Sequence, residues 1–132
     1  MTKRLLPIAV ALTLPFAGLT FAAATDRHTN KGSFIFVMKS APSEPVVGSN
    51  SATLTIRDGS SGAAVEGATI KVVPWMTMHG HGSPKNAGVK EKGKGVYEVD
   101  GLYYSMEGSW DLLINIQKGD IEDSATVVID VK

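Results

Sequence analysis

Asn50-Ser51-Ala52-Thr53-Leu54-Thr55-Ile56-Arg57, followed by Asp58-Gly59-Ser60-Ser61-Gly62, is the stretch that decides the fold. Its apolar residues Ala52, Leu54 and Ile56 alternate with polar ones, which is the period of a β-strand that buries one face. The glycines and small polar residues at 58–62 are typical of a turn. The stretch therefore predicts a half-buried strand over 50–57 that ends in a reversal of the chain.

Similar segments lie on both sides of this strand. Residues 33–39 are apolar and rich in aromatic and β-branched side chains. Residues 65–73 alternate up to Pro74, which we expect to end that strand because proline donates no ladder hydrogen bond. The remaining segments with strand composition lie at 87–92, 96–100, 110–118 and 123–131. About seven short strands in about 100 residues predict an all-β fold, an immunoglobulin-like antiparallel β-sandwich.

The last two predicted strands supply a large part of the expected core. Their inward-facing residues are Trp110, Leu112, Ile114, Ile116, Ala125, Val127, Ile129 and Val131. Trp75 and Trp110 either shield a soft metal or close the core, and we expect the second role. Residues 102–108 are expected to be a connection with aromatic anchors, and the polar residues 25–31 a mobile terminus.

The first 24 residues have a different character. Lys3 and Arg4 form a basic start, 5–24 is almost wholly apolar, and Ala22-Ala23-Ala24 offers the small residues that a signal peptidase reads. We expect residues 1–24 to be a signal peptide and 25–132 to be one domain, periplasmic or secreted after cleavage. The alternative is an uncleaved segment that anchors the domain to the inner membrane, because the apolar run approaches the ~20 residues of a membrane helix.

Composition excludes several classes of protein. Lys3 and Arg4 are two of the 13 basic residues, so the exported part has 11 basic and 13 acidic residues and a net charge of −2. This charge does not indicate nucleic-acid binding, which requires a basic surface. The absence of cysteine excludes a disulfide-linked immunoglobulin domain, a thiolate ligand and a blue-copper site. We expect no enzyme, because neither Gly-x-Ser-x-Gly nor His-Glu-x-x-His occurs in the chain.

Metal-binding side chains are concentrated in Trp75-Met76-Thr77-Met78-His79-Gly80-His81-Gly82-Ser83-Pro84. A thioether sulfur suits Cu(I), and imidazole suits copper, zinc, iron or nickel, so the mixture points first to copper. The two glycines allow a turn sharp enough for neighbouring side chains to converge. The alternative is a junction between a strand and a loop that binds no metal. Its methionines would then fill the end of the core, and its histidines would be solvated.

The expected topology would gather further methionines at this place. In a Greek-key sandwich, the strand that ends at 73 points to the same pole as the end of the first strand and the start of the sixth. Met38, Met76, Met78, His79, His81 and Met106 are all expected at this pole. Met38 also fits plain core, because it continues the inward face of Phe34 and Phe36.

Several of these segments together resemble a known family. They include Leu54-Thr55-Ile56-Arg57-Asp58, Trp75-Met76, His81-Gly82-Ser83, Gly95-x-Tyr97 and Ser105-Met106-x-Gly108-x-Trp110, and their order is similar to that of the YtkA-like/FixH-like family of bacterial exported or membrane-anchored domains. The resemblance covers nearly all of the chain after the signal. It implies a small immunoglobulin-like sandwich and a link to copper handling, beside copper efflux systems or in the supply of copper-containing respiratory oxidases.

The resemblance also implies that Met76, His81 and Met106 belong to the site. The family usually reads Met-Pro-x-Met-Gly-His-Gly, whereas this chain has Thr77 where proline is expected and His79 where the second methionine is expected. Met78 stands one place before the position of that second methionine. This departure shifts the preference from Cu(I) alone toward a site that also tolerates Cu(II) or Zn(II).

We therefore expect a periplasmic copper-binding protein, a carrier or accessory in copper efflux or copper-oxidase assembly. The expected metal ligands are Met76, Met78, His79, His81 and Met106, with Cu(I) as the favoured ion. The expected partners are a membrane copper transporter, an efflux adaptor or a respiratory oxidase assembly factor. The alternative is a non-metal interaction module that docks on a membrane pump or adaptor through the same loops.

Overall fold

The computed structural model describes residues 24–132, and every regular element in that part of the chain is a β-strand. The strands are β1 (Arg27–His28), β2 (Phe34–Ala41), β3 (Gly48–Asp58), β4 (Thr69–Met76), β5 (His81–Gly82), β6 (Gly88–Gly93), β7 (Val96–Tyr104), β8 (Gly108–Lys118) and β9 (Ile121–Val131). Seven of them have six or more residues, as the alternation predicted, and β1 and β5 add two residues each. Within 24–132 no helix is long and apolar enough to cross a membrane.

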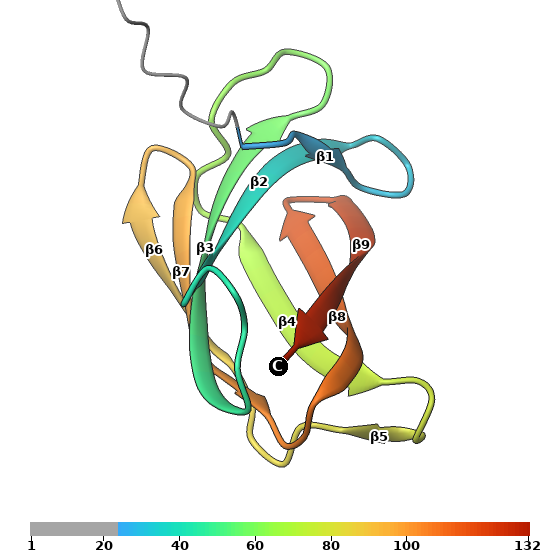
Figure 1. Cartoon of the computed structure of the whole chain (residues 1–132). Helices are drawn as coiled ribbons and strands as arrows, with labels where there is room; N and C mark the ends of the chain where they lie inside the picture. The colour runs from blue at the N-terminus through green and yellow to red at the C-terminus, as the bar shows by residue number, and fades with distance from the viewer. Residues whose placement is uncertain (1–23) are drawn as a thin grey trace, which may run out of the picture.

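The strands form two antiparallel sheets packed face to face (Figure 1). One sheet has the order β1-β2-β3-β7-β6 and the other β5-β4-β8-β9. Without the two short strands, the first sheet joins the first, second, fifth and fourth strands of the chain, and the second joins the third, sixth and seventh. That is the arrangement of an immunoglobulin constant-type domain, so the predicted sandwich is confirmed.

The core lies between the inner faces of the two sheets. All eight residues predicted to face inward from β8 and β9 are buried, as are Ala52, Leu54 and Ile56 of β3. Trp110 is fully buried and closes the core as expected. The same prediction for Trp75 is wrong, because this side chain lies on the outer face of β4 and is 38% exposed.

Pro74 does not end its strand as predicted. β4 continues through it to Met76, and Pro74 stays in register with Leu112 of β8. The carbonyl oxygen of Pro74 accepts a hydrogen bond from Ser83 N at 3.3 Å, on the side of β4 that faces away from β8. Because a residue's nitrogen and carbonyl oxygen point to the same side of a strand, the missing N–H of Pro74 falls outside the β4–β8 ladder.

The predicted connection at 102–108 is partly strand. Leu102 and Tyr104 are buried in β7 and pair with Asn50 and Gly48 of β3. The alternation is interrupted just before them, because Asp100 and Gly101 of β7 lie opposite one residue of β3. Gly101 has a positive φ of 69°, which glycine reaches without strain. The last part of β7 is therefore out of phase with the alternation that predicts the strand.

The prediction that segment 25–31 is mobile is wrong, because the segment contacts both sheets. β1 pairs with β2, and the buried Thr29 donates from Oγ1 to Oδ2 of Asp123 in β9 at 2.6 Å. The main-chain nitrogens of Lys31 and Ser33 donate to the same carboxylate. Residues 1–23 lie outside the described part of the chain, so the signal peptide over 1–24 stays a prediction.

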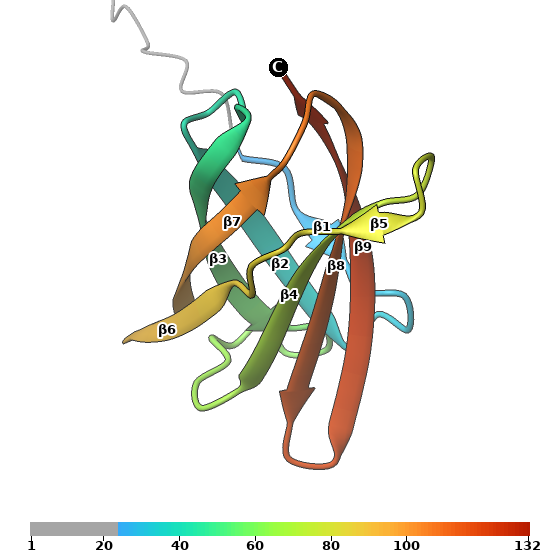
Figure 2. The same cartoon turned by 90° about the horizontal axis from the view of Figure 1, so that it is seen from below.

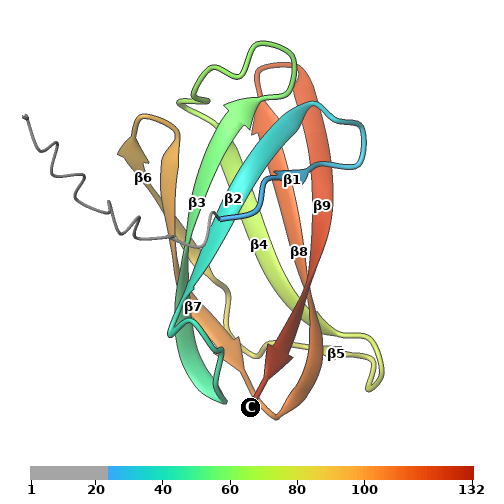
Figure 3. The same ribbon diagram turned by 45° about the horizontal axis from the view of Figure 1, so that its top comes forward.

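The strand directions gather the predicted segments at one pole of the molecule. β4 and β7 end there, and β5 and β8 begin there (Figure 3). Viewed from below, β5 and the turn before it project sideways from the body of the sandwich (Figure 2). This pole carries the candidate site.

Candidate metal site

A hairpin with a four-residue turn, 77–80, at the end of β4 brings Met76 and His81 together. They are direct partners in the antiparallel pairing of β4 with β5. Side chains of such a pair share one face of the sheet, with Cβ atoms about 4.5–5.5 Å apart. The turn between them is tight, because the main-chain nitrogens of His79 and Gly80 both donate to the carbonyl oxygen of Met76, at 3.2 and 2.9 Å. Gly80 adopts a φ of +62°, which glycine reaches without strain.

Met76 faces the interior. Its side chain is only 2% exposed, because it continues the inward face of Ile70 and Val72 past Pro74. Its methyl carbon approaches Gly108 at the start of β8 so closely that a Cβ on Gly108 would lie 3.0 Å away. The thioether is therefore part of the core and also lies beneath the hairpin. This burial agrees with the structural alternative, in which Met76 fills the end of the core.

His81 lies between this core and solvent. Its ring is half-buried and meets the edge of Trp110 in a T-shaped contact, with ring centroids 5.6 Å apart. Nδ1 lies 3.3 Å from the carbonyl oxygen of Gly82. A carbonyl oxygen only accepts, so in the neutral ring this contact places the proton on Nδ1 and the lone pair on Nε2. This is the tautomer in which a histidine binds a metal through Nε2.

Met106 reaches the site through the connection between β7 and β8. Its carbonyl oxygen accepts a hydrogen bond from Nε1 of Trp110 at 3.0 Å, so the indole fixes the loop that carries the methionine. The Met106 side chain is 38% exposed. Trp110 thus contacts His81 with its ring and the Met106 backbone with its N–H. Tyr104 packs against the same indole, and burial raises the pKa of Tyr104 to about 12, so its hydroxyl stays protonated.

Met78 and His79 occupy the turn itself and are exposed. Met78 is 85% exposed, and the His79 and His81 rings are tilted with centroids 6.1 Å apart. The turn is tied to the second sheet, because Thr77 Oγ1 donates to Oδ2 of Asp111 in β8. The two predicted residues therefore lie in the turn, outside the Met76–His81 pair.

The predicted residues do not all converge. His81 and the Met106 loop both contact Trp110, and Met76 is paired with His81. Met78 and His79 lie in the adjoining turn. Met38 lies instead within β2, half-buried, and lines a groove with Pro45 and Ile129 at the β9 edge of the second sheet. β5 lies at the opposite edge of that sheet. In the described part of the chain no three His, Asp or Glu side chains are grouped to hold a metal, so a site here depends on thioether sulfur.

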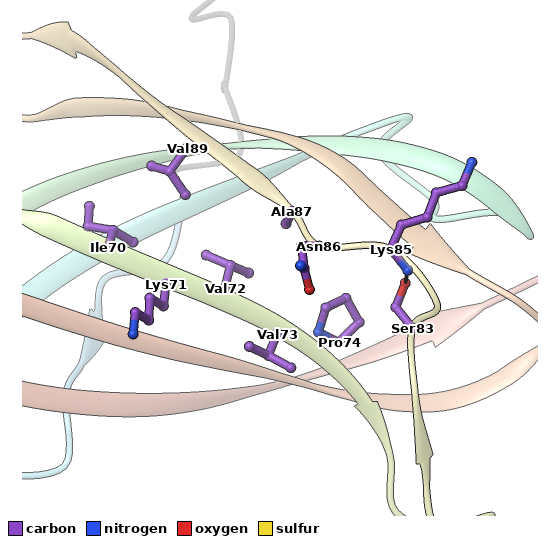
Figure 4. Close-up of a pocket in the computed structure, with 10 residues that line it drawn as sticks. All are labelled: Ile70, Lys71, Val72, Val73, Pro74, Ser83, Lys85, Asn86, Ala87 and Val89. Carbon is purple, nitrogen blue, oxygen red and sulfur yellow. Dashed lines mark hydrogen bonds between the residues drawn. The ribbon is translucent and has the colours of Figure 1, made fainter.

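A separate pocket of about 300 Å³ opens beside the hairpin, between β4 and the segment that leads to β6 (Figure 4). Its described lining contains no imidazole, thioether or carboxylate: Ile70, Lys71, Val72, Val73, Pro74, Ser83, Lys85, Asn86, Ala87 and Val89. In Figure 4, Ile70 and Val72 lie along β4, and Ala87 and Val89 lie along the neighbouring segment. The pocket therefore adds no ligand to the candidate site.

Three features of the site were not predicted from the sequence. Gly108 leaves room for the Met76 methyl, the Trp110 N–H holds the Met106 loop, and Asp111 anchors the turn. In the sequence, the spacing Met106-x-Gly108-x-Trp110 indicates only the family resemblance. A glycine directly before a strictly alternating strand is the local signal for a close approach.

The fold and the site define an immunoglobulin-like β-sandwich with methionine and histidine side chains gathered at one pole. The model of the YtkA-like family matches residues 33–115, which include the β4–β5 hairpin and the Met106 loop. The chain belongs to the YtkA-like family.

Two further comparisons concern individual proteins. The crystal structure of a DUF4426 family protein from Pseudomonas aeruginosa PAO1 is similar, with a TM-score of 0.54 and 8% sequence identity. The similarity covers 80% of this chain and 94% of that one. At this identity it supports the fold alone. No curated protein sequence matches the chain.

Proposed function

We propose that this domain binds copper, preferentially as Cu(I), through the side chains of Met76, His81 and Met106. The pairing of Met76 with His81 across β4 and β5 carries the proposal. It sets a soft thioether sulfur opposite an imidazole on one face of the sheet, and this combination favours Cu(I). Met106 enters from the neighbouring loop that Trp110 holds.

The surroundings of the pair support a binding role. The Nδ1 contact of His81 with Gly82 O orients the ring and directs the Nε2 lone pair outward from that contact. Trp110 restricts water on one side of the imidazole, because its buried ring meets His81 edge to face. A half-dry site of this kind favours a soft ion over strongly hydrated ones.

The proposed cellular role is a carrier or accessory without catalysis. The predicted signal peptide would deliver the domain outside the cytoplasm, where a thioether keeps its ligand character while a thiol is lost to oxidation. Its partners would be a membrane copper transporter, an efflux adaptor or a respiratory oxidase assembly factor. His79 beside His81 adds a second imidazole, which would let the site tolerate Cu(II) or Zn(II) as well.

An anaerobic titration tests this proposal. Protein expressed from the full chain is titrated with Cu(I) against a chromophoric chelator, beside the Met76→Leu/His81→Gln variant. We expect stoichiometric binding by the native protein and none by the variant, which keeps the volume of the core but loses both donors. His28→Gln is the matched control, because His28 is an exposed histidine in β1 at the other pole. Equal binding by native protein and double variant would refute the assignment.

A second candidate function is docking without metal. Val73, Leu113 and Val128 form an exposed apolar strip on the outer face of β4, β8 and β9, next to the exposed Trp75. Exposed apolar patches on small domains mark interaction surfaces. If docking on a pump or adaptor is the function, Val73→Ser/Leu113→Ser abolishes the interaction while Met76→Leu/His81→Gln preserves it. Copper handling requires the opposite dependence.

A further inference from the structure

The turn between β4 and β5 exposes a side chain that packing does not explain. Met78 is the most exposed of the large hydrophobic residues in the described chain, at 85%. Burying a methionine side chain stabilises a folded protein, and at this position that contribution is almost entirely absent. The exposed thioether therefore needs another explanation.

The turn presents Met78 and His79 from a fixed backbone. Two main-chain hydrogen bonds to Met76 O close it, and the Thr77–Asp111 bond ties it to β8. The backbone that carries these exposed donors is therefore held against the backbone of the buried one, Met76. The arrangement has an inner pair, Met76 and His81, and an outer pair, Met78 and His79.

The two pairs are close enough to pass an ion between them. Two imidazoles that share one ion through metal–nitrogen bonds of about 2 Å hold their ring centres about 5–6 Å apart. The His79 and His81 centroids are 6.1 Å apart, just above that range. A slight approach of the two rings would let both bind the same ion.

We propose that Met78 and His79 are exchange ligands, which take Cu(I) from a partner's donors, or present it to them, before and after it is held by Met76 and His81. The proposal rests on the function proposed above. Transfer is by ligand exchange: one bond from copper to Met78 or His79 forms as one bond to the partner's sulfur or nitrogen breaks. Copper remains Cu(I), and no electron or proton is transferred.

The structure also indicates the chemistry of the partner. A donor or acceptor must present its own thioether, thiolate or imidazole at its surface, because only an exposed soft ligand can reach the turn while Met76 stays buried. The apolar outer strip of Val73, Leu113 and Val128 lies on the same sheet as the turn. A buried copper site in the partner could not exchange with these residues directly.

The experiment separates rate from equilibrium. Protein loaded with Cu(I) is mixed in a stopped-flow instrument with bathocuproine disulfonate, and loading from the same chelate is measured in reverse. For Met78→Leu/His79→Gln we expect both rates to fall by about tenfold, which corresponds to about 1.4 kcal/mol lost in the transition state alone. Because both rates fall together, the equilibrium constant changes far less. Met76→Leu/His81→Gln loses the equilibrium binding itself, and His28→Gln changes neither quantity.

Each other outcome overturns a different statement. If the outer variant exchanges at the native rate, Met78 and His79 are not exchange ligands, although the copper site stands. If it loses affinity as severely as the inner variant, the four residues form one undivided site and the division into pairs is wrong. If the native protein binds no Cu(I), the proposed function fails together with this inference. Because Met78 and His79 are exposed, loss of folding does not confuse the comparison.

Discussion

Met76 combines two properties that substitution can separate. It fills the end of the core, and its sulfur is the proposed copper ligand. Met76→Leu nearly conserves volume and is expected to cost less than about 1.5 kcal/mol of the free energy of unfolding. Met76→Ala leaves a cavity and is expected to cost about 2–5 kcal/mol. Urea denaturation measures both.

Copper binding, unlike stability, should not distinguish these two variants. Both lose the sulfur, so both are expected to lose Cu(I) affinity in the competition titration, despite their different stabilities. If Met76→Leu retained native affinity, the thioether would have a packing role only. Met38→Leu is the matched control, because Met38 is half-buried in β2 and lies away from the hairpin.

Gly108 is expected to affect both stability and the site. Its φ is +125°, and a Cβ would approach the Met76 methyl carbon to 3.0 Å. Gly108→Ala should therefore cost about 1–3 kcal/mol of unfolding free energy from backbone strain and also weaken Cu(I) binding by displacing the Met76 side chain. Denaturation and the competition titration measure the two effects.

Gly48 provides the comparison for this substitution. Its φ is +104°, yet a Cβ there would meet nothing within 4 Å. Gly48→Ala should lower stability by a similar amount and leave Cu(I) affinity unchanged. A Gly108→Ala protein with native affinity would show that Met76 can move aside without loss of the ligand.

The lowered pKa of Asp123 predicts how the free energy of unfolding depends on pH. Burial by itself would raise the pKa of this carboxyl, but hydrogen bonds from Thr29, Ser33, Ser124 and Lys31 outweigh burial and lower the pKa to about 2. The folded pKa lies below the unfolded value of 3.8, so the stabilisation is complete above about pH 4 and is lost as the pH falls toward 2.

A substitution isolates this effect. Asp123→Asn removes the charge that the four donors hold, so the unfolding free energy should fall at neutral pH and should vary less between about pH 4 and pH 2. Equilibrium denaturation across that range measures it. Asp130→Asn, an exposed carboxyl in the same strand, is the control and should keep the native pH dependence. An unchanged slope in Asp123→Asn would contradict the assignment.

At the scale of the element, the β4–β5 hairpin depends on one link to the rest of the sheet. Thr77→Val removes the hydroxyl that donates to Asp111. We expect a loss of no more than about 1 kcal/mol in global stability, because the bond is exposed, but faster exchange of the Gly80 amide hydrogen. Amide exchange followed by NMR measures this local opening.

Thr69→Val is the control for this change. Thr69 is exposed at the other end of β4, and its hydroxyl makes no side-chain hydrogen bond among residues 24–132. The variant should leave Gly80 exchange at the native rate. If Thr77→Val also leaves it unchanged, the two hydrogen bonds to Met76 O hold the turn without help from β8.

The elements that were predicted correctly are those whose burial is periodic. β3, β8 and β9 each bury every second residue, and the alternation in sequence reports this directly. Prediction failed where contacts other than alternating burial determine the local structure. Pro74 remains in β4 because its missing donor points away from β8, and the bulge at Gly101 breaks the alternation of β7. Thr29 is buried by its bond to Asp123, a contact across 94 residues that no local pattern contains.

At the scale of the whole molecule, topology made the site predictable in outline. Antiparallel pairing fixes strand directions, so the ends of β4 and β7 and the start of β8 had to share a pole. The sequence also contained the burial of Met76, because Ile70, Val72 and Met76 share one phase across Pro74. The exposure of Met78 and the position of the Trp110 N–H depend on turn geometry and on contacts between elements, so they required the structure.

The largest expected effect on the whole molecule comes from copper itself. A ligand that binds only the folded state stabilises it by about 2.7 kcal/mol at a free concentration of 100 times its dissociation constant. Because Met76 lies in the core between the sheets, binding there is linked to global unfolding. Anaerobic Cu(I) should therefore raise the midpoint of thermal unfolding of the native protein and leave Met76→Leu/His81→Gln unaffected. A shift of the same size in both proteins would place the stabilising copper elsewhere in the chain.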